Sequence, residues 1–218
     1  MNKRSSLVKE GFQAIKIELL SKIPIYKGGT MDKFIQFLEN HLGTIEYGWS
    51  NDDNGERLPV QIVKYSKGPF SGTKTFSTLG LNKVPLTSYV SGKQIWQELI
   101  FVSYSNSGNI NIPSLLAQVS QIALDSGSAF LRGDVIGPYG PIFDDSNLEA
   151  FYVTIPCYFS DSFDAFKVDD KKTIIMAWLI PITSKEAEFI RQNGWEQFEE
   201  KLEELDPDLI DFKRESII

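Results

Sequence analysis

The sequence contains very few of the residues that build disulfides, zinc sites and nucleophile–base pairs. One cysteine, Cys157, and one histidine, His41, occur in 218 residues. A single cysteine excludes a disulfide within the chain and a zinc site made from its own thiolates, and it fits a reducing compartment. Cys157 lies in the apolar stretch FYVTIPCYF, where we expect a buried, unreactive thiol.

Long apolar runs and an excess of positive charge are also missing. No uninterrupted apolar segment approaches the length that spans a bilayer. The 29 Asp and Glu outnumber the 22 Lys and Arg, which gives a net charge of −7. Nucleic acids and anionic membranes repel such a protein. The composition therefore predicts a soluble, cytoplasmic protein that binds neither of them directly.

Residues 1–30 differ from the rest of the chain, because they hold six Lys or Arg and only two Glu. Charged residues interrupt their apolar pattern and no small-residue cleavage site follows, so an export signal is not expected. Residues 27–31, Lys-Gly-Gly-Thr-Met, can be encoded by a purine-rich ribosome-binding sequence and a start codon. We expect a basic leader over 1–30 that is not native, a natural start at Met31, and one domain over 31–218.

Hydrophobic periodicity from Met31 onward predicts an α+β domain. Apolar residues at helical spacing predict helices over 31–42 and 113–126. A capping box of Thr183 and Glu186 opens a third helix, which Asn193-Gly194 separates from a fourth. Strands are expected on both sides of Asn54-Gly55 and over 74–81, 94–105, 148–159 and 171–183. These elements predict a single domain with a mostly antiparallel β-sheet and packed α-helices.

The segment KYSKGPFSGTKTFS resembles a phosphate-binding loop in composition but not in spacing. Three residues, rather than four, separate Gly68 from Gly72, and Thr73 separates Gly72 from Lys74. The residues that follow favour a strand, whereas a phosphate-binding loop opens a helix. We therefore expect neither a nucleotide site nor any other cofactor.

Adjacent aspartates are candidate ligands for a hard cation, since carboxylates bind Ca²⁺ and Mg²⁺. Each pair lies in a segment with turn chemistry, where Asp is favoured because it accepts hydrogen bonds from its own backbone. None of the pairs has the spacing of a calcium-binding loop. We expect surface turns and no metal site at Asp52–Asp53, Asp144–Asp145 and Asp169–Asp170.

A hydrolase requires a nucleophile and a base, and His41 is the only imidazole that could serve as that base. It lies at the edge of the apolar stripe of its helix, so we expect a partly buried structural histidine. A pairing of His41 with Cys157 or a serine stays an alternative. A small hydrolase that uses these residues or the aspartates is thus a second alternative function.

The C-terminal segment is strongly acidic, with eleven Asp or Glu and five Lys or Arg over residues 184–218. One interpretation is the solvated face of amphipathic helices. The other is an electrostatic field that speeds encounter with a cationic protein. The sequence allows both.

Several segments occur in a characteristic order: KTFSTLGL, QELIFVSYS, LDSGSAFLRGDVI, LEAFYVTIPCYF, IIMAWLIPITSKEAEFIRQNGWEQFEEKL and DLIDFKRESII. The most specific is Pro-Ile-Thr followed by a helix, Asn-Gly and a second helix. In this order they resemble the suppressor-of-fused domain family, and the resemblance covers Met31 to the end of the chain.

The resemblance implies a binding fold on which a short partner segment lies as an additional strand. It places partner contacts at Gly133 and Asp134, in the loop after the long helix. A helical position that is aromatic in the animal members falls on Ile122, so a different peptide specificity is implied. Asp144 and Asp145, in the same loop segment, complete the candidate partner-binding set.

Bacterial single-domain proteins of this family resemble antitoxins or immunity proteins of secreted polymorphic toxins. The resemblance implies a cytoplasmic, non-enzymatic protein that neutralises a cognate toxin, with a basic nuclease domain as the expected partner. An acidic protein can compete with nucleic acid for such a domain. A general peptide-binding or scaffolding module is the first alternative.

Overall fold

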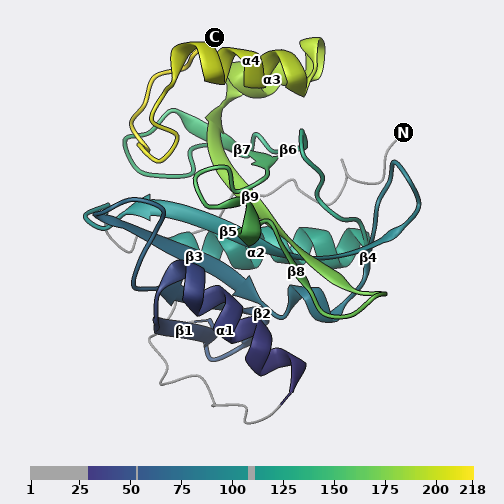
Figure 1. Ribbon diagram of the computed structural model, residues 1–218. Coiled ribbons are helices and arrows are strands. Elements are labelled where there is room, and N and C mark those ends of the chain that lie inside the picture. Colours follow the sequence, from purple (N-terminus) through teal and green to yellow (C-terminus); the bar gives the residue numbers. More distant parts are fainter. Residues whose placement is uncertain (1–28, 53, 108–110) are drawn as a thin grey trace. The chain divides into compact units, whose positions relative to one another are not determined.

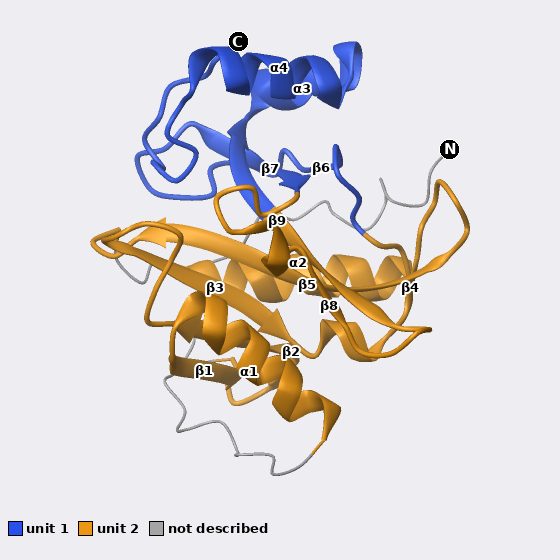
Figure 2. Cartoon of the chain, in the orientation of Figure 1, with its two compact units in different colours: residues 1–13, 130–154, 179–218 blue, residues 14–129, 155–178 orange. Residues whose placement is uncertain are grey.

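The computed structural model describes residues 29–52, 54–107 and 111–218. They form two compact units, which Figures 1 and 2 show in the same orientation. The larger unit contains the described residues of 29–129 and 155–178, and the smaller unit contains 130–154 and 179–218. Apart from Gly29 and Thr30, the expected leader lies outside the described residues. That the leader over 1–30 is not part of the native protein stays a prediction, and so do the limits of the expected domain over 31–218.

A mixed, mostly antiparallel sheet confirms the expected fold class. Hydrogen bonds connect the strands in the order β1-β2-β3-β5-β9-β7-β6, with β4 beside β5 and β8 beside β9. The strands are β1 Ile45–Asn51, β2 Arg57–Tyr65, β3 Thr73–Leu79, β4 Leu86–Thr87, β5 Gln94–Tyr104, β6 Val135–Ile136, β7 Leu148–Thr154, β8 Ala165–Lys167 and β9 Thr173–Thr183. The β5–β9 pair is parallel, a feature that apolar patterning does not reveal.

In the larger unit, helices α1 (Thr30–Leu42) and α2 (Ile112–Ser126) lie on opposite faces of the sheet (Figure 1). The apolar stripe of α1 is buried, as its spacing predicts. Helix α2 contacts β2, β3 and β5. Strand β5 is buried from Gln97 to Ser103 and shows no alternation of apolar and polar residues, as is typical of a strand that is covered on both faces.

In the smaller unit, helix α3 (Ser184–Asn193) follows β9 directly and packs against β7 and helix α4 (Trp195–Leu205). The predicted capping box is confirmed: the Thr183 hydroxyl accepts from the N–H of Glu186, and the Glu186 carboxylate accepts from the N–H of Thr183. Gly194 separates the two helices with a φ of 92°. A left-handed φ of this kind favours glycine, so the predicted break at Asn193-Gly194 is confirmed.

The expected strand over 148–159 is too long, because β7 ends at Thr154. Pro156 has no N–H to donate to a sheet. Beyond it the chain turns, with the N–H of Cys157 bonded to the carbonyl of Ile155 and the N–H of Phe159 to the carbonyl of Pro156. The Cys157 thiol is exposed, so the expectation of a buried thiol is wrong.

Turn aspartates behave as the sequence indicates. The Asp52 carboxylate accepts from the N–H groups of Asn54 and Glu56 at 2.9 and 2.8 Å and closes the predicted β1–β2 hairpin. The Asp169 carboxylate accepts from the N–H groups of Lys171 and Lys172 in the same way. These backbone hydrogen bonds lower the pKa of Asp169. Asp53 lies outside the described residues.

Candidate functional site

The segment that carries Gly133 and Asp134 is a four-residue turn, hereafter the 131–134 turn. The N–H of Asp134 donates to the carbonyl of Leu131 at 3.0 Å, and the Asp134 carboxylate accepts from the N–H of Leu131 at 2.9 Å. Gly133 has a φ of 93° at the third position, which is the pattern of a type II turn. The Asp134 side chain therefore stabilises the turn itself, as Asp does in many tight turns.

The 131–134 turn leads directly into β6. The N–H of Gly133 donates to the carbonyl of Val153, and the N–H of Val153 donates to the carbonyl of Asp134. Two residues thus lie opposite one, which is a β-bulge with glycine at its first position. The bulge fixes the backbone of Asp134 against β7.

Helix α4 lies close against the 131–134 turn. A Cβ atom at Gly133 would stand 2.4 Å from Cδ1 of Trp195, so a side chain does not fit there. The Arg132 guanidinium lies 4.8 Å from the centre of the Trp195 ring, within the range of a cation–π interaction. Glycine at 133 is therefore required both by its φ and by the indole.

Arg132 also forms a salt bridge with Glu199 of α4, and Nε contributes one hydrogen bond at 3.1 Å. The same carboxylate accepts from the hydroxyls of Tyr152 and Thr154 at 2.7 and 3.1 Å. Burial acts to raise the pKa of Glu199, but the hydrogen bonds from Arg132 and Tyr152 outweigh burial and hold it below its ordinary value. Glu199 thus connects the turn, β7 and α4 as an ionised group.

The other predicted partner contacts lie on different elements. Asp144 and Asp145 are exposed in the loop before β7, and Asp145 has a left-handed φ of 55°. Ile122 is half-buried on α2 in the larger unit, whereas the other four residues lie in the smaller unit. The proposed role of these five residues stays a prediction.

Negative charge is concentrated in the smaller unit. Residues 130–154 and 179–218 hold fifteen Asp or Glu and six Lys or Arg. Helix α4 and the residues that follow it expose six carboxylates, here called the α4 acidic surface: Glu196, Glu200, Glu203, Glu204, Asp206 and Asp208. Such a surface attracts a cationic protein and repels nucleic acid.

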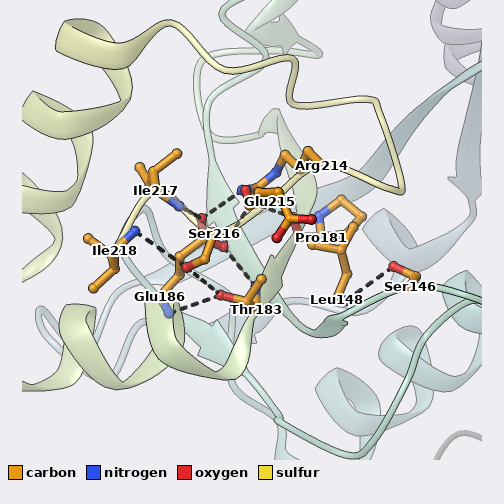
Figure 3. Close-up of polar contacts among 10 residues, drawn as sticks. All are labelled: Ser146, Leu148, Pro181, Thr183, Glu186, Arg214, Glu215, Ser216, Ile217 and Ile218. Carbon is orange, nitrogen blue, oxygen red and sulfur yellow. Dashed lines mark hydrogen bonds and ion pairs between the residues drawn. The ribbon is translucent and has the colours of Figure 1, made fainter.

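A buried ion pair attaches the C-terminal segment to the start of α3 (Figure 3). The Arg214 guanidinium bonds both carboxylate oxygens of Glu186, at 2.6 and 2.9 Å, and the carbonyl of Pro181 at 3.1 Å. The N–H of Ile217 donates to the same carboxylate. Sequence patterning found Glu186 as a capping residue but gave no sign of Arg214 as its partner.

A second buried carboxylate, Glu98 on β5, has no counterpart in the sequence-based predictions. It accepts from the Thr78 hydroxyl at 2.5 Å and from the N–H groups of Gly80 and Asn82 at 2.8 and 3.2 Å. Burial raises the pKa of Glu98, although these hydrogen bonds act in the opposite direction. An acidic residue inside an apolar strand pattern was the available signal. Glu98 fixes the turn between β3 and the short 3₁₀ helix η2 (Leu81–Lys83).

His41, the histidine considered as a catalytic base, packs against aromatic rings. The His41 ring lies 4.9 Å from that of Phe37 and 5.2 Å from that of Phe163, and burial lowers the pKa of the imidazole. This confirms a partly buried histidine.

Across the described ranges, no three His, Cys, Asp or Glu side chains gather as a metal site requires. None of the helices in the described part has the length and apolar character of a membrane span.

Known proteins share this sequence pattern and fold. The suppressor of fused protein family matches residues 56–215. A suppressor of fused homolog from Neisseria gonorrhoeae FA 1090 has a TM-score of 0.62 and 20% identity, over 87% of this chain and 94% of that one. The structure of the Sufu–Fu complex has a TM-score of 0.60 and 14% identity, over 86% of this chain and 90% of that one.

Drosophila Suppressor of Fused gives a TM-score of 0.59 and 14% identity, over 86% of this chain and 50% of that one. Curated proteins give no match. At these identities the solved structures show a shared fold, and the family match spans well over half of the chain. The chain therefore belongs to the suppressor of fused (SUFU) family.

Proposed function

We propose that this SUFU domain is a cytoplasmic immunity protein that binds a cognate toxin and blocks it without chemistry of its own. The expected partner is a basic protein, such as the nuclease domain of a polymorphic toxin. The toxin's active site must be cationic to hold phosphates, so an acidic protein can occupy it in place of nucleic acid.

The observation that carries this proposal is the charge of the smaller unit. Its fifteen acidic and six basic residues include the exposed carboxylates of the α4 acidic surface. Membership of the SUFU family supports a protein partner, because the Sufu–Fu complex is a protein complex built on the same fold. The 131–134 turn, which is held by its own hydrogen bonds and packs against Trp195 of α4, supplies a preorganised backbone.

Co-expression with the product of the adjacent gene tests the proposal. We expect growth rescue and co-purification with the wild-type chain. The triple variant Glu200→Lys, Glu203→Lys, Glu204→Lys should slow association about tenfold or more at low salt, because steering by charge sets the encounter rate. Stopped-flow measurements at two salt concentrations give the rate. Equal rates for the triple variant and the wild type would contradict a role for the α4 acidic surface.

Asp134 should contribute to partner affinity, and two substitutions separate its possible roles. Asn keeps an oxygen that can accept from the N–H of Leu131, whereas Ala removes it. If the carboxylate contacts a cationic partner, both Asp134→Ala and Asp134→Asn should weaken binding about tenfold or more in calorimetry. Asp169→Ala is the matched control, since Asp169 also accepts backbone N–H groups in a turn.

Loss of affinity in Asp134→Ala alone would show that the residue acts only by shaping the turn. Unchanged affinity in both Asp134 variants would remove the residue from the interface.

A scaffolding module is the second candidate, favoured by the similarity to the Sufu–Fu complex. The same co-expression assay distinguishes the two functions. A scaffold binds its partner and leaves the growth of toxin-producing cells unchanged, whereas an immunity protein restores growth.

A further inference from the structure

The loop between β4 and β5 exposes adjacent large apolar side chains. Val90 and Tyr89 are 75% and 57% exposed. Val84 and Pro85, just before β4, are exposed as well. Figure 2 shows this loop extending from the rest of the larger unit. We call Lys83, Val84, Pro85, Tyr89, Val90 and Lys93 the 83–93 surface.

Backbone and side-chain hydrogen bonds hold this loop. The N–H of Ser88 donates to the carbonyl of Lys93, and the N–H of Gly92 donates to the carbonyl of Ser88, both at 2.8 Å. The Ser88 hydroxyl accepts from the N–H of Ser91 at 3.1 Å. At the base of the loop, the N–H of Thr87 donates to the carbonyl of Gly127, and the N–H of Ala129 donates to the carbonyl of Thr87. Because the loop is already ordered, Tyr89 and Val90 can act as anchors at low entropic cost.

The 83–93 surface is basic although the protein is acidic. From Arg57 to Gln97 the chain contains six Lys or Arg and no Asp or Glu. Lys83 and Lys93 are exposed, and neither forms a salt bridge with another described residue. An apolar centre with a cationic rim fits a surface that has an apolar centre and an anionic rim.

The end of α4 has that complementary composition. Leu205 is 53% exposed and lies between exposed carboxylates, Glu203 and Glu204 before it and Asp206 after it. These carboxylates also form no salt bridge within the described ranges. Leu205 is thus an apolar side chain with an anionic rim, opposite in charge to the 83–93 surface.

We propose that the 83–93 surface of one molecule docks on the C-terminal end of α4 of a second copy. The contact joins two different surfaces, so it either closes into a symmetric pair or ring or continues as an open chain. It shares the α4 acidic surface with the proposed function, but its test needs only the purified chain and no toxin. It also places Glu203, Glu204 and Asp206 under a second molecule, so that a toxin and a second copy compete for the α4 acidic surface.

Sedimentation velocity of the purified full-length chain tests the contact. The weight-average mass should rise with protein concentration at about 0.01 M salt and fall at about 1 M salt, where charges are screened beyond about 3 Å. Tyr89→Ser with Val90→Ser should weaken association at least about tenfold, because these side chains are the anchors. Ile218→Ser, at a similarly apolar exposed position, should leave association unchanged.

Charge exchange gives the sharper test. Lys83→Glu with Lys93→Glu should abolish self-association, and so should Glu203→Lys with Glu204→Lys, because each variant presents like charges to its own copies. An equimolar mixture of the two variants should associate again. A wild type that stays monomeric at all concentrations would overturn the proposal. So would a mixture that does not associate, or a Tyr89/Val90 variant that changes toxin binding but not self-association.

Discussion

Replacing Arg214 with Met should destabilise the protein by about 3–5 kcal/mol, because it leaves the Glu186 carboxylate buried without its counter-ion. The side chains of Arg214 and Glu186 are 5% and 0% exposed. Methionine fills a similar volume, so the lost charge rather than a cavity dominates the effect. Urea unfolding followed by circular dichroism measures the change in the free energy of unfolding.

Two further variants separate the ion pair from general damage. Lys167→Met breaks a salt bridge of 2.8 Å whose side chains are 69% and 95% exposed, and it should change stability little. Adding Glu186→Gln to Arg214→Met removes the isolated charge, so the double variant should be more stable than Arg214→Met alone. If Arg214→Met unfolds at the same urea concentration as Lys167→Met, the buried ion pair contributes no more to stability than the exposed one.

Gly133→Ala should destabilise the smaller unit by about 3 kcal/mol or more. A non-glycine residue at a φ of 93° costs on the order of 1–3 kcal/mol. The added Cβ also meets the Trp195 ring at 2.4 Å, so the indole must move away from Arg132. Gly140→Ala is the matched control, since Gly140 has a φ of 98° and nothing within 4 Å of its would-be Cβ.

A double-mutant cycle with Trp195→Ala isolates the steric part of this effect. Without the indole, Gly133→Ala should cost about as much as Gly140→Ala, because only backbone strain remains. Equal costs for the two alanine variants in the wild-type background would show that α4 does not constrain the turn. In that case Asp134 would owe its position to the bulge alone.

Elements with a strong local pattern could be predicted from the sequence. The helices from Thr30 and Ile112 and the Thr183–Glu186 capping box depend on spacing over a few residues, and the structure confirms each. The end of β7 was placed too late because apolar residues continue through Pro156 to Phe159. Proline has no N–H to donate to a sheet, so the strand ends before Pro156 although the apolar pattern continues. Cys157 lies in the turn that follows and is exposed.

Contacts between distant residues were not predictable in this way. Nothing in the sequence around Arg214 indicates that it pairs with Glu186, or that Arg132 lies between Trp195 and Glu199. The parallel β5–β9 pair is of the same kind, because a strand pattern does not encode its partner's direction. The resemblance selected Asp134 as a binding residue, and only its hydrogen bond to the N–H of Leu131 reveals that it also stabilises a turn.

By itself the sequence determined the fold class, the main helices and strands and the acidic C-terminal segment, since each is recorded in composition and short-range spacing. The order of its segments also carried the resemblance to the SUFU family. Tertiary structure alone decided which charges are buried as pairs, which face water, and that Gly133 lies against an indole. The physical reason is that burial and pairing depend on where the chain brings together residues far apart in sequence, and the energy of a charge depends on that environment.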